Sequence, residues 1–303
     1  MEGAILSHNH GMNRLLIIGC GDIALRVIPL LQQRYRVFAL VRDPAKFERL
    51  RALGVMPIEG DLDKPDSLAR LTSIAQVVLH FAPPVAQAHT DVRTRHLLAA
   101  LTRGTPPKQL IYISTSGVYG DCQGALVSET HRLNAHTPRA KLRIDAEQQI
   151  RRWAMRNGVR ASLLRVPGIY AAERLPLERI RANAPAIVSH EDSYSNHIHA
   201  DDLACIVLAA LRYGQTNRVY HAVDEDEMKM GDYFDAVADA FALPRPTRLS
   251  RAEVQRSVSP MMWSFMNESR RLTNHRMQQE LNVRLRYPTL ATLLDSLRQG
   301  RSD

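Results

Sequence analysis

The segment at residues 15–31, LLIIGCGDIALRVIPLL, constrains the fold of this chain more than any other. Its apolar start, residues 15–18 closing on Gly19, is typical of a buried parallel strand. Gly19, Gly21 and Ala24 have the spacing G-x-G-x-x-A, and a helix with an apolar face comes next. In this order of strand, turn and helix, the free N–H groups at the start of the helix face an anion. The segment therefore predicts a binding site for the pyrophosphate of a dinucleotide.

Each small residue of this turn has a separate role in the predicted site. Gly19 permits the tight turn, Gly21 lets the backbone approach the phosphates, and Ala24 lets the helix pack on the strand. Asp22 is unexpected because its charge opposes a phosphate, and we expect it to face solvent or to cap the helix. With Ile23, which starts the apolar face, the cofactor-binding candidates of this segment are Gly19, Gly21, Asp22 and Ile23.

The composition gives no indication of a membrane or secreted protein. Of the 303 residues, 45% are apolar and 23% are charged, which is ordinary for a globular protein. No apolar run approaches the roughly 20 residues that cross a bilayer, and the first residues do not resemble a signal peptide. The three cysteines lack paired spacing, which indicates a reducing compartment and no zinc site. We therefore expect a cytoplasmic protein with a disordered tail over residues 1–12 and no metal.

The net charge of +9 raises the alternative that the chain binds nucleic acid. The basic residues are mostly arginines scattered along the chain, without a basic tail or a recognisable nucleic-acid motif. A basic, solvated surface without a nucleic-acid partner is therefore favoured. Salt-dependent retention of nucleic acid in a filter-binding assay would contradict this interpretation.

Strand and helix patterns alternate over the first half of the chain. After the first unit, strand patterns lie at residues 36–41, 55–59, 76–81, 110–114 and 161–165, and helical patterns lie at 43–53, 66–71, 91–101 and 139–156. Repeated units of this kind specify a parallel sheet with helices on both faces. The chain is therefore predicted to be an α/β protein with a Rossmann-like, doubly wound parallel sheet.

The pattern loosens after residue 165, which indicates a second and smaller unit. Helical patterns return at residues 200–211 and 232–241, a short strand is predicted at 218–222, and the remainder is helical with breaks. We expect a dinucleotide-binding domain over residues 13–165 plus about 199–222. The segments at about 166–198 and 223–303 are expected to form a smaller substrate-binding lid.

The end of the second predicted strand decides between the two nicotinamide cofactors. An acidic residue there binds the ribose hydroxyls of NAD, whereas a basic residue accommodates the 2′-phosphate of NADP. The strand ends with Val41, Arg42 and Asp43, and the planar guanidinium of Arg42 suits a phosphate. NADP is therefore favoured over NAD; in the alternative, Arg42 is a surface charge and Asp43 caps the next helix. Asp61 and Leu62 follow the third strand, where the adenine is expected.

Further motifs follow in order across most of the chain: GDL at 60–62, HFA at 80–82, YISTSGVYG at 112–120, Glu129, RVPGIY at 165–170, IHADDLA at 198–204, RLTN at 271–274 and RYP at 286–288. With the glycine turn, this set resembles the extended and atypical short-chain dehydrogenase/reductases, the NAD(P)-dependent epimerase/dehydratase group. The resemblance implies a Rossmann-like cofactor domain, with Phe81 and Ala82 among the cofactor-binding residues, and a small substrate domain. It also implies an oxidoreductase or epimerase that acts on a small, sugar-like molecule and is usually a homodimer.

Three groups carry the chemistry that the resemblance implies. A tyrosine exchanges a proton with the substrate, a lysine four residues later lowers the pKa of that tyrosine and holds the nicotinamide ribose, and a serine or threonine binds the substrate oxygen. Thr115 has the last role and Lys141 matches the lysine, but Thr137 stands where the tyrosine is expected. An aliphatic hydroxyl is a far weaker acid than a phenol, so Thr137 can hydrogen-bond a substrate but cannot serve as the general acid. The catalytic candidates are Thr115, Thr137 and Lys141.

The proton donor is therefore unassigned, and four other side chains are alternatives. Tyr119, Tyr170 and Tyr194 can reach the site from elsewhere in the chain, and His199 is a further candidate. Each also has a simpler explanation: Tyr119 and Tyr170 as wall of the substrate pocket, and His199 as a packed residue or a helix cap.

Arginines near the expected substrate cleft are candidates for anion binding. Arg165, Arg174 and Arg179 correspond to residues that hold the pyrophosphate in sugar-nucleotide members of the group, although a structural role explains each equally well. The substrate-binding candidates are thus Tyr119, Arg165, Tyr170 and Arg174. The apolar residues at 261–266, MMWSFM, are expected in the lid core or at an oligomer contact.

Two functional hypotheses remain open at this point. The leading hypothesis is a dinucleotide-dependent enzyme that acts on a small molecule. The second is a sensor or scaffold that binds NADP(H) without turnover, which the missing tyrosine favours.

Overall fold

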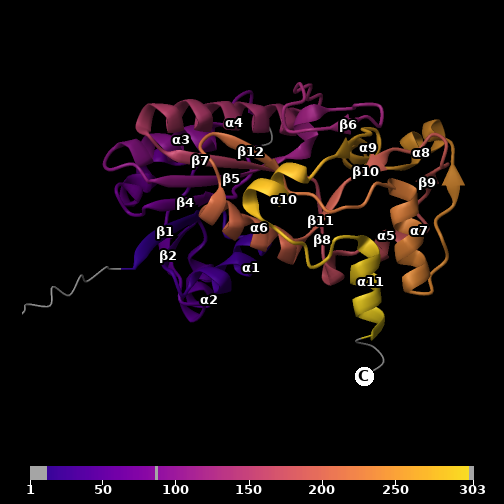
Figure 1. Ribbon diagram of the computed structural model, residues 1–303, viewed down its shortest axis with the longest axis horizontal. Coiled ribbons are helices and arrows are strands. Elements are labelled where there is room, and N and C mark those ends of the chain that lie inside the picture. Colours follow the sequence, from indigo (N-terminus) through magenta and orange to yellow (C-terminus); the bar gives the residue numbers. More distant parts are fainter. Residues whose placement is uncertain (1–11, 86–87, 300–303) are drawn as a thin grey trace, which may run out of the picture.

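The computed structural model describes residues 12–85 and 88–299, and its larger unit is built around one parallel sheet (Figure 1). The predicted tail, residues 1–12, lies outside the described residues apart from Met12. The seven strands have the order β12-β7-β5-β4-β1-β2-β3. They are β1 (Asn13–Ile18), β2 (Tyr35–Val41), β3 (Met56–Glu59), β4 (Val77–His80), β5 (Gln109–Thr115), β7 (Arg160–Val166) and β12 (Arg218–His221). The predicted Rossmann-like α/β fold is thereby confirmed.

The two faces of the sheet are covered by different helices because successive side chains of a strand point to opposite sides. Leu15 and Ile17 pack in one core and Leu16 and Ile18 in the other, and all four are fully buried. The first face is covered by α1 (Asp22–Leu31), α2 (Phe47–Ala52), α6 (Ala200–Tyr213) and α10 (His275–Leu281). The second is covered by η2 (Pro65–Leu71), α3 (Val92–Thr102) and α4 (Pro138–Asn157), which lie above the sheet in Figure 1.

Two predicted helices have a different form in the structure. The helix expected at 43–53 is divided into a 3-10 turn, η1 (Pro44–Lys46), and α2, because Asp43 caps the turn. The segment expected as an α-helix at 66–71 is the 3-10 helix η2, whose buried residues Leu68 and Leu71 are three positions apart. That spacing places both side chains on one face of a 3-10 helix, directly against the sheet.

A smaller lid lies at the carboxyl ends of the strands, on the right in Figure 1. Its separate apolar core joins α5 (Leu177–Arg181), α7 (Met230–Ala240), α8 (Arg251–Ser257), α9 (Pro260–Met266) and α11 (Leu290–Gln299). Short pairs of strands connect its segments: β8 (Gly168–Tyr170) with β11 (His197–His199), β9 (Ala186–Ile187) with β14 (Arg248–Leu249), β10 (Tyr194–Ser195) with β13 (Met228–Lys229), and β6 (Leu126–Val127) with β15 (Arg271–Leu272). Between residues 12 and 299, apart from 86 and 87, no helix is long and apolar enough to cross a membrane.

The division between the two units differs from the predicted boundaries. The C-terminal segment 223–303 does not belong to the lid as a whole, because α10 packs on α6 and β12 and its residues Met277 and Leu281 are fully buried in the core of the sheet domain. The chain therefore returns to the cofactor domain before α11 ends in the lid.

Candidate active site

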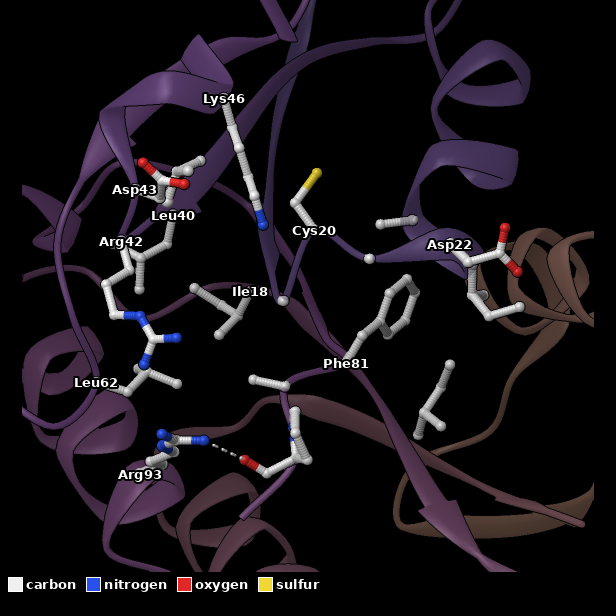
Figure 2. A pocket seen from close by; sticks show the side chains of 18 of the residues that line it. Ile18, Cys20, Asp22, Leu40, Arg42, Asp43, Lys46, Leu62, Phe81 and Arg93 are labelled. Carbon is white, nitrogen blue, oxygen red and sulfur yellow. Dashed lines mark hydrogen bonds between the residues drawn. The ribbon is translucent and has the colours of Figure 1, made fainter. Parts of the chain in front are cut away.

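A cavity of about 860 Å³ opens at the carboxyl ends of β1, β2 and β4 (Figure 2). We call it the first cavity. The structure brings almost all of the predicted cofactor-binding residues together around it: Gly19, Gly21, Asp22, Ile23, Arg42, Asp61, Leu62, Phe81 and Ala82. Ligands bind at this edge in open α/β sheets, because the helix N-termini and the loops that follow the strands meet there.

The two glycines of the turn are required for different reasons. Gly19 has a φ of +93°, and a Cβ on it would lie 2.5 Å from the backbone nitrogen of Ala82. Gly21 is the N-cap of α1, and a Cβ on it would meet no protein atom within 4 Å. Gly19 therefore serves the packing of β1 against β4, whereas Gly21 leaves open space in front of the helix N-terminus, where a phosphate fits.

Asp22 is exposed to solvent, as one alternative predicted, but it does not cap the helix. It is the first residue of α1, and the N-cap, Gly21, has no side chain to form a cap. The Asp22 carboxylate accepts hydrogen bonds from Arg26 and, at 3.0 Å, from Arg174. Figure 2 shows it on the side of the cavity away from Arg42. Asp22 thus pairs with two guanidinium groups, of which that of Arg26 is shared with Glu173 and Asp201.

The opposite wall of the first cavity is basic. Arg42 and Lys46 extend into the cavity from the end of β2 and from the following turn (Figure 2). The carboxylate of Asp43 accepts a hydrogen bond from the backbone N–H of Ala45 at 3.0 Å, so the predicted capping role is confirmed. Lys46 was not predicted, although its position four residues after Arg42, at the end of η1, could have indicated it.

Arg93 is a second basic residue of this wall that sequence reasoning missed. Its guanidinium donates two hydrogen bonds to Asp63, at 2.8 and 2.6 Å, and one to the carbonyl of Pro83 (Figure 2). The hydrogen bonds from Arg93 lower the pKa of Asp63. Because Arg93 is already paired, the free positive charge of this wall comes from Arg42 and Lys46 among the described residues.

A second cavity of about 270 Å³ adjoins the first, beneath the lid. We call it the second cavity. Three segments line both: β5 supplies Ile113 to the first and Thr115 to the second, and α4 supplies Arg143 to the first and Arg139 to the second. The segment after β7 supplies Ile169 to the first cavity and Gly168 to the second. Two strand residues on one face are about 7 Å apart, and one helical turn is about 5.4 Å, so the two cavities are neighbours.

Thr137 lines the second cavity together with Thr115, as predicted, but the predicted lysine position on α4 is wrong. Lys141 is exposed and lines neither cavity, and the cavity-lining residues four apart are Arg139 and Arg143. Thr137 is the N-cap of α4, and its hydroxyl oxygen accepts the N–H of Ala140 at 3.3 Å. Two residues turn a helix by about 200°, so Lys141 points away from the face that carries Arg139 and Arg143.

Arg143 occupies the position at the first cavity that was assigned to Lys141. Its guanidinium donates to the Tyr112 hydroxyl at 2.9 Å and to the carbonyl of Ile113 at 2.8 Å. These two bonds hold the charged group at the end of β5. Thr115, the predicted ligand of the substrate oxygen, lines the second cavity and caps the turn η3 (Ser116–Tyr119) by accepting the N–H of Gly117 at 3.2 Å.

Arg165 and Tyr119 are not substrate-binding residues, in contrast to the prediction. Both are buried, with 3% and 1% of their surface exposed. Arg165 donates to the two carboxylate oxygens of Glu147, at 3.1 and 2.7 Å, and to the hydroxyl of Tyr119 at 2.7 Å. The Tyr119 hydroxyl is 2.6 Å from Nε2 of His221, and burial raises its pKa to about 12. These residues form a buried network under the site.

The remaining predicted substrate residues are also in other places. Tyr170 is buried against the rings of His197 and His199 and lines neither cavity. Arg174 lines the first cavity, not the second, and pairs with Asp22. His199 is the N-cap of α6, which confirms its simpler explanation.

The apolar segment 261–266 has two roles. Met266 is buried in the lid core, with Met262 and Trp263 packed against it, as one interpretation predicted. Met262 and Phe265 also line the second cavity, so α9 forms part of its cover. Met261 projects from the same helix with 71% of its surface exposed.

Few side chains of the second cavity can move a proton. Tyr194 is the tyrosine among its described lining residues; the Lys229 ammonium is 5.6 Å and the Arg271 guanidinium 5.1 Å from the centre of its ring. His197 also lines the cavity, but burial lowers its pKa to about 4, so it is neutral near pH 7. Arg139 is permanently charged and cannot act as a general acid.

A parallel doubly wound sheet with a glycine turn at its first strand, and a cavity on that turn, is typical of a dinucleotide-binding protein. The chain belongs to the NAD dependent epimerase/dehydratase family, whose model matches residues 23–222.

Known proteins with a similar sequence or structure have different activities. NAD(P)H azoreductase of Xenophilus azovorans is 25% identical over 265 residues, which are 84% of this chain and 82% of that protein. A functionally unknown conserved protein from Silicibacter pomeroyi has a TM-score of 0.77 and 27% identity, over 95% of this chain and 99% of that one. A dTDP-glucose 4,6-dehydratase from Streptomyces venezuelae, solved with NAD bound, has a TM-score of 0.75 and 17% identity, over 96% and 97% of the two chains. The last similarity concerns the fold alone.

Proposed function

We propose that this protein is an NADP(H)-dependent oxidoreductase that transfers a hydride to or from a small molecule in the second cavity. The observation that carries the proposal is the shared wall of the two cavities, to which β5 and α4 contribute residues on both sides. One side has the open helix N-terminus at Gly21, and the other has the hydroxyl of Thr115. The site thus has an end that suits phosphates and an end that suits a reacting molecule.

The chain's own residues have the following proposed roles. Arg143, fixed by Tyr112 and Ile113, holds the ribose next to the nicotinamide. The Thr115 oxygen accepts the N–H of Gly117, so its hydroxyl proton is free to be donated to a substrate oxygen or nitrogen. Tyr194 is the proposed proton donor because it is the phenol of the second cavity. A reduced nicotinamide supplies the hydride when it is bound.

NADP is proposed over NAD because Arg42 and Lys46 point into the first cavity, while Asp43 is occupied as a cap. We expect Arg42→Ala to weaken NADPH binding by 10- to 100-fold, since a hydrogen bond to a charged group contributes about 1.5–3 kcal/mol. NADH, which lacks the 2′-phosphate, is expected to bind Arg42→Ala and the wild type within about twofold.

Isothermal titration calorimetry with both dinucleotides measures these differences. Arg103→Ala is the control. Arg103 is exposed at the C-terminal end of α3 and lines neither the first nor the second cavity. Equal losses for NADPH and NADH in Arg42→Ala would contradict the assignment of the 2′-phosphate to Arg42.

A dinucleotide sensor without turnover is the second candidate function, because the residues of α4 at the two cavities include arginines and not the expected tyrosine and lysine. A turnover assay distinguishes the two candidates. We expect oxidation of NADPH at 340 nm with a panel of quinones, azo compounds, aldehydes and ketones, and a 100- to 10,000-fold lower kcat in Tyr194→Phe. Absence of turnover across the panel, from a protein that binds NADPH, would favour the sensor. Full activity of Tyr194→Phe would remove Tyr194 as the donor.

A further inference from the structure

We propose that the second cavity binds a small organic anion with an apolar body, and that Arg139 and Arg179 hold its charged group. This inference rests on the proposed function, because it names the class of substrate for the same site. The inference rests on two arginines, Arg139 and Arg179, that line this cavity and have no carboxylate partner in the part of the chain that the structure describes. The guanidinium of each lies over an aromatic ring.

Arg139 lies at the start of α4, where a cation is unfavourable for the helix dipole. Its guanidinium lies over the ring of Phe265, 4.6 Å from the ring centre, and forms no ion pair with any residue of 12–85 or 88–299. Although the side chain keeps an exposed edge, its partial burial and the neighbouring Arg143 lower its pKa. Helix stability therefore does not explain this arginine, and an anion bound in front of it would.

Arg179 enters the same cavity from the lid, on α5. Its guanidinium lies 4.8 Å from the ring centre of Phe234 and donates to the carbonyl of Pro185, at 2.6 Å, and to the sulfur of Met266, at 4.0 Å. Its Nε is buried without a hydrogen-bond partner among the described residues, and burial lowers the pKa of the group. A buried guanidinium nitrogen without an acceptor is costly, so Arg179 is suited to donate a hydrogen bond to a ligand oxygen.

The charges of the cavity wall are unbalanced. Its third arginine, Arg270, is paired with Glu268 at 2.7 Å, and Glu268 is the carboxylate among the described lining residues. Three guanidinium groups thus face one carboxylate, which leaves Arg139 and Arg179 to be neutralised. Arg139 is exposed and Arg179 is half-buried, and a ligand carboxylate, sulfonate or phosphate would provide a partner for both guanidinium groups.

The rest of the wall and its size define the body of the ligand. The apolar side chains of Met230, Phe234, Met262 and Phe265 line the cavity, so a ring or short alkyl group fits beside the anion. The volume of about 270 Å³ lies at the lower end of the roughly 300–1,000 Å³ typical of ligand pockets. The cavity therefore suits a compact monoanion better than a nucleoside diphosphate sugar.

The test compares charged probes with neutral analogues of the same shape. Benzoate, 2-naphthoate and naphthalene-2-sulfonate are titrated against benzamide, 2-naphthamide and naphthalene-2-sulfonamide by calorimetry, with and without saturating NADPH. We expect at least one anion to bind at least tenfold more tightly than its neutral analogue. Arg139→Met and Arg179→Met should each weaken that anion at least tenfold, while Arg139→Lys retains part of the affinity.

Arg151→Met is the matched control, because Arg151 lies exposed on the same helix and lines neither cavity; it should leave the Kd of the anion unchanged. Melting temperature and NADPH affinity show whether each variant is folded. The inference is overturned if no anion binds below 10 mM, if the neutral analogues bind equally, if the two methionine variants retain wild-type affinity, or if UDP-glucose binds more tightly than every probe. Failure of the proposed function differs from these results, since it appears as the absence of NADPH binding, or of NADPH turnover, in the wild type.

Discussion

Gly19→Ala will destabilise the protein and abolish dinucleotide binding, whereas Gly21→Ala will abolish binding alone. The Cβ of an alanine at position 19 would lie 2.5 Å from the backbone nitrogen of Ala82 at a φ of +93°, and backbone atoms cannot move aside as a flexible side chain can. We expect a loss of about 2–4 kcal/mol in the free energy of unfolding. At position 21 the Cβ meets no protein atom within 4 Å, so the cost there is about 1 kcal/mol or less.

Urea denaturation and calorimetry with NADPH measure the two effects separately. Gly21→Ala should melt close to the wild type and yet bind NADPH at least 100-fold more weakly, because its methyl group fills the space that the phosphates require. Tight NADPH binding by Gly21→Ala would show that the pyrophosphate does not lie at this turn.

Arg165→Met will destabilise the protein by about 3–5 kcal/mol, because the buried carboxylate of Glu147 loses its cation. This is a large part of the roughly 5–15 kcal/mol that stabilises a typical protein. Arg174→Met is the matched control: Arg174 was also predicted to bind substrate, but its ion pair with Asp22 is exposed and its removal should cost less than about 1 kcal/mol.

Chemical denaturation gives the free energies, and the double variant Arg165→Met, Glu147→Met should recover part of the loss. The folded fraction of Arg165→Met should bind NADPH within about threefold of the wild type, since Arg165 lines neither cavity. If Arg165→Met is as stable as the wild type but binds substrate more weakly, then Arg165 binds substrate, as the sequence analysis predicted.

The fold and the first cavity could be predicted because their signals are local in sequence. Buried parallel strands are short apolar runs, and the turn from Gly19 to Ala24 combines its strand, glycines and helix within about ten residues. The residues after β2, β3 and β4 converge at one edge of the sheet by topology, so Arg42, Asp61 and Phe81 followed without knowledge of side-chain contacts.

The second cavity could not be predicted in the same way because it depends on rotation and long-range pairing. The sequence analysis expected Lys141 to face the site, but Lys141 lies on another face of α4. The inward face carries Arg143 and, four residues later, the buried Glu147. Likewise, Arg165 and Glu147 are 18 residues apart on different elements, so the sequence around Arg165 does not indicate its ion-pair partner. The lid residues, Arg179 and Phe265 among them, come from separate segments without a common pattern.

Helix α4 carries Arg139 and Arg143 on consecutive turns, about 6 Å apart along a rigid rod. If the proposed anion is held at Arg139, the atom that it presents to the first cavity would lie at a fixed distance from its charged group. Regioselectivity would then follow the distance between the anionic group and the electrophilic atom. Homologous compounds lengthened by one methylene would react at a different carbon.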